Sequence, residues 1–373
     1  MQLTLHLTDN CNLNCNYCFI SRNPARISRE VAFAAVKLAI KENCDQKTSG
    51  LLFYGGEPLL EKELIYDIVS HTKELKEKTG HAFHYKMTTN GTLLDEEFLK
   101  FSQSINLAIG FSCDGHAQDD CRLFPNGKGS MELLSDKIPL LLKYRPYSIG
   151  MSVIDPSTVH KASSTVQFLF DKGFRYITIN LNYSRTAPWT SRHLSVLEEE
   201  YNKMADMYIK WTTAEEKFYL SPFDIKIVSH LKGHKYHLDR RAMAKNQPSV
   251  ATDGKIYSSS RFLGNPAFEI GDVFSGIDTK KQSVIFEQSA ISPESCKGCM
   301  LQPRCNYSYD NLNHNESGYF SDLSPLQCAH EQLIAPIADR VAEKLYKDKN
   351  ALFVHKHYNE LYPVMSLVED MGR

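Results

Sequence analysis

Short apolar runs alternate with longer amphipathic segments from the start of the chain to about residue 215. Short runs of this kind predict strands, and helically spaced apolar residues predict helices. Six strand-then-helix repeats require parallel pairing with right-handed crossovers, so this part should form a barrel or an open doubly wound sheet. The expected strands cover residues 3–7, 50–56, 81–91, 105–115, 147–154 and 174–182.

The segments between the runs carry clear helical signals. Residues 28–43 have apolar side chains at helical spacing, and Ser28 stands where an N-cap is expected. Residues 61–78, rich in Glu and Lys, and residues 194–217 are also expected to be helical. The chain therefore belongs to the α/β class.

Each unusual short motif follows one of the first four strands. "CNLNCNYC" (11–18) follows the first, "GGEP" (55–58) the second, "TTNGT" (88–92) the third and "SCDG" (112–115) the fourth. Parallel barrels and doubly wound sheets both build their sites at the carboxyl ends of the strands. We therefore expect these loops to converge on one pocket.

Composition narrows the functional classes. The chain has 373 residues and a formal net charge of -1, so no global basic field indicates nucleic acid or an anionic membrane as a partner. The N-terminus lacks a basic segment followed by a long apolar one, and no run of about 18 apolar residues occurs. We expect a cytoplasmic protein with no membrane partner.

The alternation stops after residue 217. A polar, His- and Lys-rich connector (229–247) follows, and Asp253-Gly254 then lies between two short apolar runs, as in a hairpin turn. We predict three parts: a barrel-like domain over 1–217, a smaller domain over 218–332 and a helical extension over 333–373.

The first motif places three cysteines, Cys11, Cys15 and Cys18, within eight residues. A structural zinc site needs four ligands, and a ferredoxin run has uniform short spacings with a proline after the last cysteine. Three cysteines can instead hold three irons of a [4Fe-4S] cube and leave the fourth iron open to a small molecule. A zinc loop completed by a distant fourth ligand is the alternative.

The CxxxCxxC spacing, with Tyr17 just before the last cysteine, resembles the signature of the radical S-adenosylmethionine (radical SAM) superfamily. This resemblance implies a partial (β/α)6 TIM-like barrel in which S-adenosylmethionine chelates the open iron of a [4Fe-4S] cluster held by the three cysteines. It also implies cofactor-binding roles for further residues. Gly55, Gly56 and Glu57 would receive the methionine amino group, Tyr17 would pack near adenine, and Thr89, Asn90, Ser112 and Asp114 would lie near the ribose and sulfonium.

The second group of cysteines is Cys296, Cys299, Cys305 and Cys328. On spacing alone these suit zinc or a closed [4Fe-4S] cluster. With the hairpin before them, they resemble the SPASM/twitch-like domain that radical SAM peptide maturases carry for auxiliary clusters. That resemblance implies one auxiliary [4Fe-4S] cluster on these four residues.

Departures from the full SPASM pattern limit the number of clusters. Ser259 stands where a cysteine is expected after the hairpin glycine, no cysteine lies between Cys121 and Cys296, and Tyr309 stands at a third expected cysteine position. All three positions belong to the first auxiliary cluster. We therefore expect only one auxiliary cluster, the one held by the four cysteines named above.

Catalytic candidates come from "QDDCR" (118–122), which resembles a His-Asp-x-x-Arg loop of the family. Asp119 and Arg122 match it, while Gln118 replaces the His. Cys121 is a candidate thiol hydrogen donor. Cys44, at the end of a helix, is expected to have no special role, and Cys113 is expected to belong to the core.

The resemblance implies a peptide maturase that installs a thioether, as in sactipeptides or ranthipeptides, or another cross-link. Its partners would be a precursor peptide and an electron donor such as flavodoxin or ferredoxin. A leader would be recognised by a separate leader-binding protein, by the second domain, or not at all. Alternatives are an anaerobic sulfatase-maturing (formylglycine-generating) enzyme, radical SAM action on a small molecule or RNA, and a non-catalytic metal-binding protein. The sulfatase maturases carry an Asp where this chain has Ser260.

Overall fold

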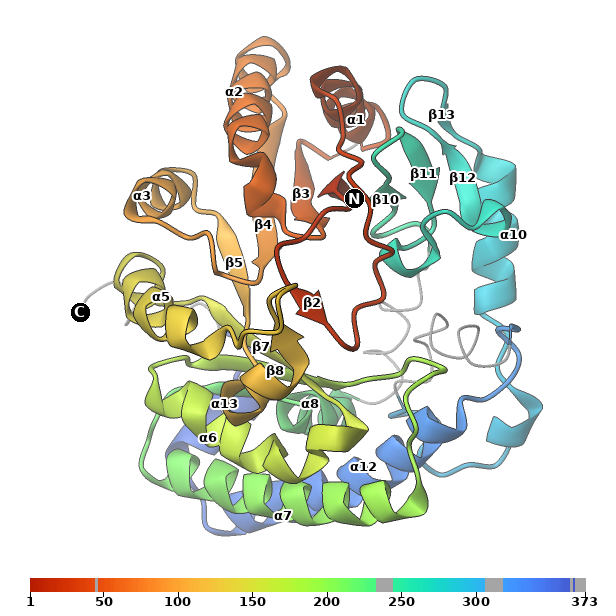
Figure 1. Cartoon of the computed structure of the whole chain (residues 1–373). Coiled ribbons are helices and arrows are strands. Elements are labelled where there is room, and N and C mark those ends of the chain that lie inside the picture. Colours follow the sequence, from red (N-terminus) through yellow and green to blue (C-terminus); the bar gives the residue numbers. More distant parts are fainter. Residues whose placement is uncertain (44–45, 233–243, 306–317, 363–364, 366–373) are drawn as a thin grey trace.

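The computed structural model describes residues 1–43, 46–232, 244–305, 318–362 and 365 (Figure 1). Their strands form an eleven-stranded sheet, in the order β13-β12-β11-β10-β1-β3-β4-β5-β7-β8-β9, and a separate pair, β2-β6. All neighbours from β10 to β9 in this order are parallel. The parallel strands are β1 (Gln2–Thr8), β3 (Thr48–Gly55), β4 (Ala82–Thr89), β5 (Ala108–Ser112), β7 (Ile149–Ile154), β8 (Tyr176–Leu181), β9 (Tyr219–Ser221) and β10 (Ser249–Val250).

Helices cover the outer face of this curved sheet, and the short strand β2 (Asn14–Cys15) lies in the middle of the ring (Figure 1). The helices that follow successive strands are α1 (Arg29–Lys41), α2 (Lys62–Thr79), α3 (Glu96–Ser104), α5 (Met131–Tyr144), α6 (Ala162–Asp171) and α7 (Ser191–Thr213). An open doubly wound sheet would carry helices on both faces. The arrangement is therefore barrel-like, and the predicted α/β class with parallel pairing is confirmed.

Strand β1 shows why sequence periodicity identifies these strands. Leu3, Leu5 and Leu7 are fully buried in the apolar core. Thr4 and His6 on the opposite face are also fully buried, and the Thr4 hydroxyl accepts a hydrogen bond from Gln247 at 3.1 Å. One face of the strand therefore packs in the apolar core, and the other carries polar groups.

The predicted elements match the structure with small shifts at their ends. Ser28 caps α1, its hydroxyl accepting a bond from the Val31 amide at 3.2 Å. The strand expected over 105–115 is shorter because the chain still turns at Asn106, whose φ is +51°. The connector expected over 229–247 begins as helix, since α8 spans Phe223–Lys232, and its residues 233–243 lie outside the described residues. Cys44 and Tyr309 also lie outside them.

The hairpin around Asp253-Gly254 joins the same sheet as the barrel strands. β10 pairs in parallel with β1, and β11 (Lys255–Tyr257) pairs antiparallel with β10. β12 (Glu269–Asp272), β13 (Gly276–Ile277) and α10 (Thr279–Ser289) complete this edge. β9, which begins after residue 217, pairs with β8. The domain boundaries at 217 and 332 stay a prediction.

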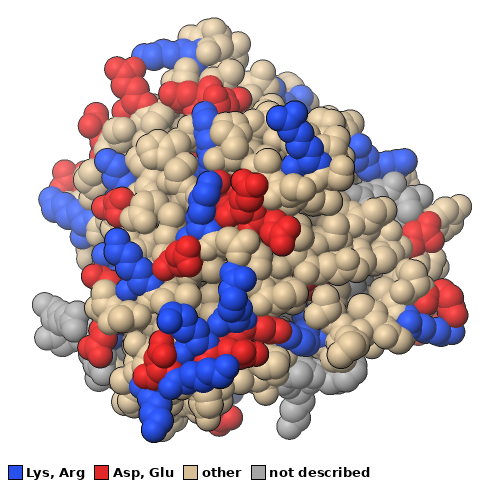
Figure 2. Space-filling view, turned by 90° about the horizontal axis from the view of Figure 1, so that it is seen from below, with Lys and Arg blue, Asp and Glu red and all other residues tan. Residues whose placement is uncertain are grey.

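The remaining helices, α12 (Pro325–Lys347) and α13 (Ala351–Tyr358), pack against α7, with α8 beside α12 (Figure 1). Lys226 of α8 and Glu331 of α12 form a buried ion pair. On the face in Figure 2, Lys and Arg are interspersed with Asp and Glu. None of the helices in the described ranges combines the length and apolarity of a membrane span.

A buried cluster around Asp224 fastens α13 to the rest of the fold. The Asp224 carboxylate accepts a bond from the Tyr208 hydroxyl at 2.8 Å and pairs with Lys356 at 2.6 Å. His357 lies beside it, and burial lowers the pKa of His357 from 6.5 to about 4. The folded state therefore favours neutral His357.

This shift predicts acid sensitivity. As pH falls below 6.5, the unfolded chain takes up a proton at His357 that the folded chain refuses, so folding free energy is lost until the pH approaches the folded value near 4. Between about pH 7.5 and about pH 5 the loss should be about 2 kcal/mol greater for the native protein than for His357→Gln. Denaturant unfolding at both pH values measures it, and parallel pH dependences would contradict it.

Candidate functional site

The three-cysteine loop lies between β1 and α1. Cys11 and Cys15 are half-buried and Cys18 is exposed. The pKa of the Cys11 thiol is raised to about 11, chiefly by burial and to a smaller extent by negative charge on Glu57, Cys15 and Cys18. The three sulfurs therefore lie within electrostatic range of one another. Holding all three as thiolates needs compensating positive charge, which the iron ions of a cluster supply.

The turn after β4 braces the start of this loop. The Asn90 side-chain amide donates to Cys11 Sγ at 3.7 Å and to Asn12 Oδ1 at 2.9 Å. Asn12 in turn donates to the Thr92 hydroxyl at 2.8 Å. "TTNGT" therefore fixes the first cysteine of the loop.

The segment after β5 braces the second half. β2 pairs with β6 (Arg122–Leu123), which sets Cys15 opposite Arg122, and the Asn16 amide donates to the Cys121 carbonyl at 3.0 Å. Arg122 lies 3.9 Å from Cys15 Sγ, and its guanidinium carbon is 5.3 Å from the centre of the Tyr17 ring. These contacts hold the second cysteine.

Asp114 connects this brace to the barrel. Its fully buried carboxylate accepts from Arg122 Nε at 2.9 Å and from the Tyr17 hydroxyl. It also accepts from the Ser152 hydroxyl and the Val153 amide, both at 2.9 Å, at the end of β7. Burial raises the pKa of Tyr17 well above its ordinary value, so this phenol stays a hydrogen-bond donor.

"GGEP" lies directly against the start of the cysteine loop. A Cβ on Gly56 would fall 2.0 Å from the Asn10 carbonyl oxygen, and one on Gly55 would fall 2.3 Å from that of Thr8. The amides of Gly56 and Glu57 donate to the carbonyls of Thr8 and Asn10 at 2.8 and 2.9 Å. Only glycine permits this approach, so the pair sets the position of the loop.

Glu57 is fully buried, and burial raises its pKa to about 7. Its carboxylate accepts from the Leu59 amide at 3.0 Å, the Thr89 hydroxyl at 2.7 Å and the Asn90 amide at 2.8 Å. The side chain therefore supports the turn that holds Cys11. Ser112 is half-buried at the end of β5.

The other two catalytic candidates lie in supporting positions. Asp119 is exposed and accepts from the Met131 amide at 2.8 Å, at the first residue of α5. Cys121, in the short helix α4 (Gln118–Cys121), is 1% exposed, and its sulfur is 4.0 Å from the Thr158 hydroxyl. Burial raises its pKa to about 11. Their catalytic roles stay predictions, and of the three only Arg122 contacts a cysteine of the loop.

Sequence reasoning missed several supporting residues. Gln118, noted only as a replacement for His, accepts from the Asp114 amide at 2.8 Å and donates to the Ser130 hydroxyl at 2.7 Å. Ser152 near the end of β7, and Asn182 just after β8, which donates to Asp155 at 2.8 Å, also went unnoticed. The signal was available, because both lie at the strand edge where the recognised motifs occur.

The second cysteine group gathers beside α12. Cys328 lies in the first turn of this helix, and negative charge on Cys299 and Cys328 raises the pKa of Cys296, after burial as the largest cause. Arg304, next to Cys305, forms a bidentate pair with Asp339 of α12 at 2.5 and 2.6 Å. Cys296, Cys299 and Cys328 are therefore electrostatic neighbours, while Cys305 is tied to the same helix through Arg304.

No three His, Cys, Asp or Glu side chains among the described residues are arranged to hold a metal ion. An iron-sulfur cube binds each cysteine through a different iron, so its ligands stand farther apart than those of one ion. At the first loop, the three cysteine thiols and the close backbone of Gly55 and Gly56 fit the binding of an iron-sulfur cluster.

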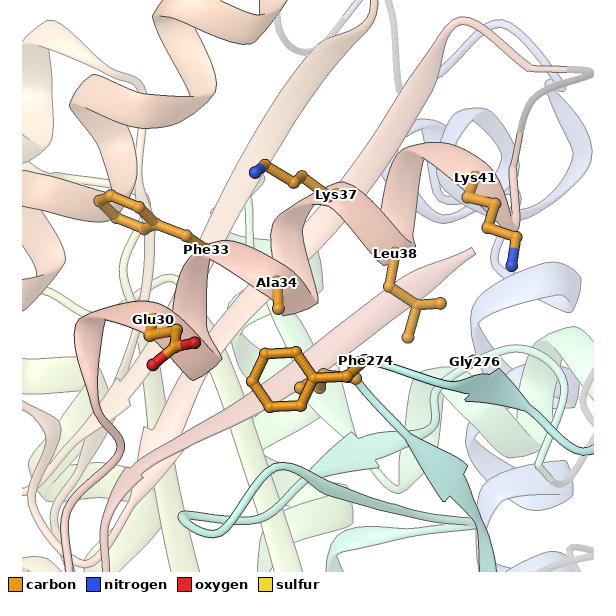
Figure 3. Close-up of a pocket in the computed structure, with 9 residues that line it drawn as sticks. Glu30, Phe33, Ala34, Lys37, Leu38, Lys41, Phe274 and Gly276 are labelled. Atoms are coloured by element: carbon orange, nitrogen blue, oxygen red, sulfur yellow. The ribbon is translucent and has the colours of Figure 1, made fainter.

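Two described cavities lie apart from the first cysteine loop. One of about 520 Å³ lies between α1 and the β12-β13 hairpin, lined by Glu30, Phe33, Lys37 and Phe274 among others (Figure 3). Another of about 580 Å³ lies between the loop after β8 and the start of α12, with Trp189 and Ala329 in its lining. Only the second adjoins a predicted ligand, since Ala329 follows Cys328.

Residues 5–169 match the family model of the radical SAM superfamily. The chain therefore contains a radical SAM domain, as the motifs of the first half predicted. A cysteine-type anaerobic sulfatase-maturating enzyme of Clostridium novyi is 25% identical over 322 residues, which are 80% of this chain and 84% of that protein.

Two solved structures resemble the whole fold. Native anSMEcpe with bound AdoMet and Kp18Cys peptide has a TM-score of 0.77 and 17% identity, covering 93% of this chain and 99% of that one. Streptococcus suis SuiB bound to precursor peptide SuiA has a TM-score of 0.57 and 14% identity, covering 88% and 75%. At these identities the likeness shows the fold alone.

Glu57 gives a direct test of the braced loop. In Glu57→Gln, an NH2 group replaces one of the two carboxylate oxygens. Whichever way the new amide is turned, its NH2 faces the backbone N–H of either Leu59 or Asn90, which then has no acceptor. We expect a loss of about 1–3 kcal/mol in unfolding free energy and less iron retained after reconstitution. The exposed Glu63→Gln is the control and should change stability by about 0.5 kcal/mol or less. Equal behaviour of the two variants would contradict the bracing role.

Proposed function

We propose that this protein is a radical SAM enzyme that reductively cleaves S-adenosylmethionine and abstracts hydrogen from a peptide, installing a thioether or another cross-link in a ribosomally synthesised peptide. The observation that carries the proposal is the three-cysteine loop, braced at Cys11 by Asn90 and at Cys15 by Arg122. Such a loop presents three protein ligands and leaves one iron of a cube for the cofactor.

The residues of the chain orient and shield the reacting groups. Cys11, Cys15 and Cys18 would hold the cluster, and the close backbone of Gly55 and Gly56 would lie against the methionine end of the cofactor. When bound, a reduced cluster with S-adenosylmethionine supplies the 5′-deoxyadenosyl radical that abstracts hydrogen. The chain contributes fixed geometry and exclusion of water.

Support for a peptide substrate comes from the similar proteins. Both structural neighbours are named with bound peptides, one with the Kp18Cys peptide and one with precursor peptide SuiA. We propose the same substrate class here, with flavodoxin or ferredoxin as electron donor and a separate protein for leader binding.

Formylglycine formation is the second candidate, favoured by the likeness to sulfatase-maturating enzymes. The position where those enzymes carry an Asp holds Ser260, whose hydroxyl lies 2.9 Å from that of Ser249 on β10. A neutral hydroxyl accepts a proton far more weakly than a carboxylate, so Ser260 is a poor substitute for an acidic residue in general-base chemistry. We therefore favour cross-link formation.

We also propose one auxiliary [4Fe-4S] cluster, held by Cys296, Cys299, Cys305 and Cys328. If cysteine ligates each of its irons, no iron is open to substrate, so the cluster would serve structure or electron transfer.

Anaerobic reconstitution tests the central proposal. The native protein should hold about eight irons and form 5′-deoxyadenosine with S-adenosylmethionine and dithionite. Replacing Cys11, Cys15 and Cys18 together by Ala should leave about four irons and no deoxyadenosine. Cys113→Ala, a change at a fully buried core thiol, should retain both. Cleavage by the triple variant, or bound zinc without cleavage by the native protein, would refute the proposal.

The auxiliary cluster has its own test. Cys299→Ala should lower the iron content to about four per chain and lower the thermal midpoint, because a bound cluster stabilises the folded state. Iron analysis and anaerobic thermal unfolding measure both. Unchanged iron would remove Cys299 from the ligand set, and about twelve irons in the native protein would mean a second auxiliary cluster.

A further inference from the structure

Arg261 lies in the hairpin region that departs from the full SPASM pattern. It belongs to a short 3-10 helix, Ser260–Phe262, that follows β11. The Ser259 hydroxyl accepts from the Arg261 amide at 3.2 Å. The serine at the expected cysteine position therefore caps the turn that carries Arg261.

The Arg261 side chain lies among aromatic residues from three segments. Its guanidinium carbon is 5.0 Å from the centre of the Phe19 ring, and Phe19 directly follows Cys18. Tyr54, at the end of β3, and Tyr183, just after β8, both lie within electrostatic range of the guanidinium. Tyr54 is also within range of Cys18 and Arg122. Arg261 therefore lies close to the predicted radical site.

The same cation lies toward the second cysteine group. The Tyr183 hydroxyl is 2.8 Å from His330 Nδ1, and His330 follows Cys328 by two residues on α12. Arg261 thus lies against Phe19, next to the loop that would hold the open iron, and within electrostatic range of Tyr183, which contacts the helix that carries an auxiliary ligand.

Within the described part of the chain, the Arg261 guanidinium has no acidic partner and donates no hydrogen bond. The other arginines near the two cysteine groups have polar partners, since Arg122 pairs with Asp114, Arg304 pairs with Asp339, and Arg22 donates to the Leu13 carbonyl and to Asn14. The Arg261 side chain is exposed, yet burial lowers its pKa. Protein atoms therefore surround much of the guanidinium, while solvent still reaches the side chain.

We propose that Arg261 binds a side-chain carboxylate of the substrate, beside the residue that loses hydrogen. The inference rests on the proposed function and names a specificity determinant for it. A guanidinium binds carboxylates through two parallel hydrogen bonds, and its planar face can stack on an aromatic ring such as that of Phe19. The methionine carboxylate of S-adenosylmethionine has the same chemistry, so the test must separate the two sources.

The test uses reconstituted protein loaded with S-adenosylmethionine and a mass-resolved pool of short synthetic peptides. Each peptide is made as a pair that differs only by Glu or Gln at one position. After anaerobic ultrafiltration, the native protein should retain Glu members of some pairs about tenfold over their Gln partners. Arg261→Gln should lower that ratio to about one, and Arg261→Lys should retain part of it. Lys280→Gln, an exposed cation on α10, should leave it unchanged.

Two further readings separate the alternatives. If Arg261→Gln lowers the affinity for S-adenosylmethionine about tenfold while the Glu preference persists, the carboxylate is that of the cofactor and the proposal falls. No Glu preference in the native protein would also overturn it. Deoxyadenosine is measured in the same samples. Its absence from native protein that still prefers Glu would refute the proposed function and support the carboxylate site.

Discussion

The buried Asp114 carboxylate is the interaction on which the candidate site most depends. It receives donors from the cysteine loop, from Arg122 and from the end of β7. Removing one partner of such a buried pair leaves an uncompensated charge and typically costs about 3–5 kcal/mol. Leu13 is buried, but Cys18 and Phe19 at the end of the loop are exposed. The polar contacts of this carboxylate and the second brace at Glu57 therefore add to the buried Leu13 and the close Gly55-Gly56 backbone in fixing the loop.

Local sequence patterns were sufficient for the framework. A buried strand such as Leu3–Leu7 and a capped helix starting after Ser28 follow from side-chain period and capping, which act over a few residues. The convergence of four motifs followed from one rule about parallel strands. The role of Glu57 could not be predicted in this way, because its carboxylate oxygens accept hydrogen bonds from Thr89 and Asn90, which lie 32 and 33 residues away in the sequence. No local pattern encodes such a partner.

Asp119 is a second residue whose role the local sequence pattern did not reveal. Its spacing before Arg122 suggested chemistry, but a side chain's direction depends on the helix turn that carries it, and here the carboxylate caps the start of α5. A motif match therefore placed the correct loop near the site. It could not distinguish the residue that contacts the cysteines from the residue that supports the loop.

The hairpin edge shows how such a fold can change its chemistry without changing its framework. β10 continues the barrel sheet through β1, so the turn after β11 is fixed relative to the cysteine loop. An iron-sulfur cluster with thiolate ligands is anionic and would repel a carboxylate. At this position the chain instead carries two serines held by hydrogen bonds and a cation without an acidic partner among the described residues. The positive charge of Arg261 at this fixed turn makes the electrostatic potential near the predicted radical site more favourable for the proposed substrate carboxylate.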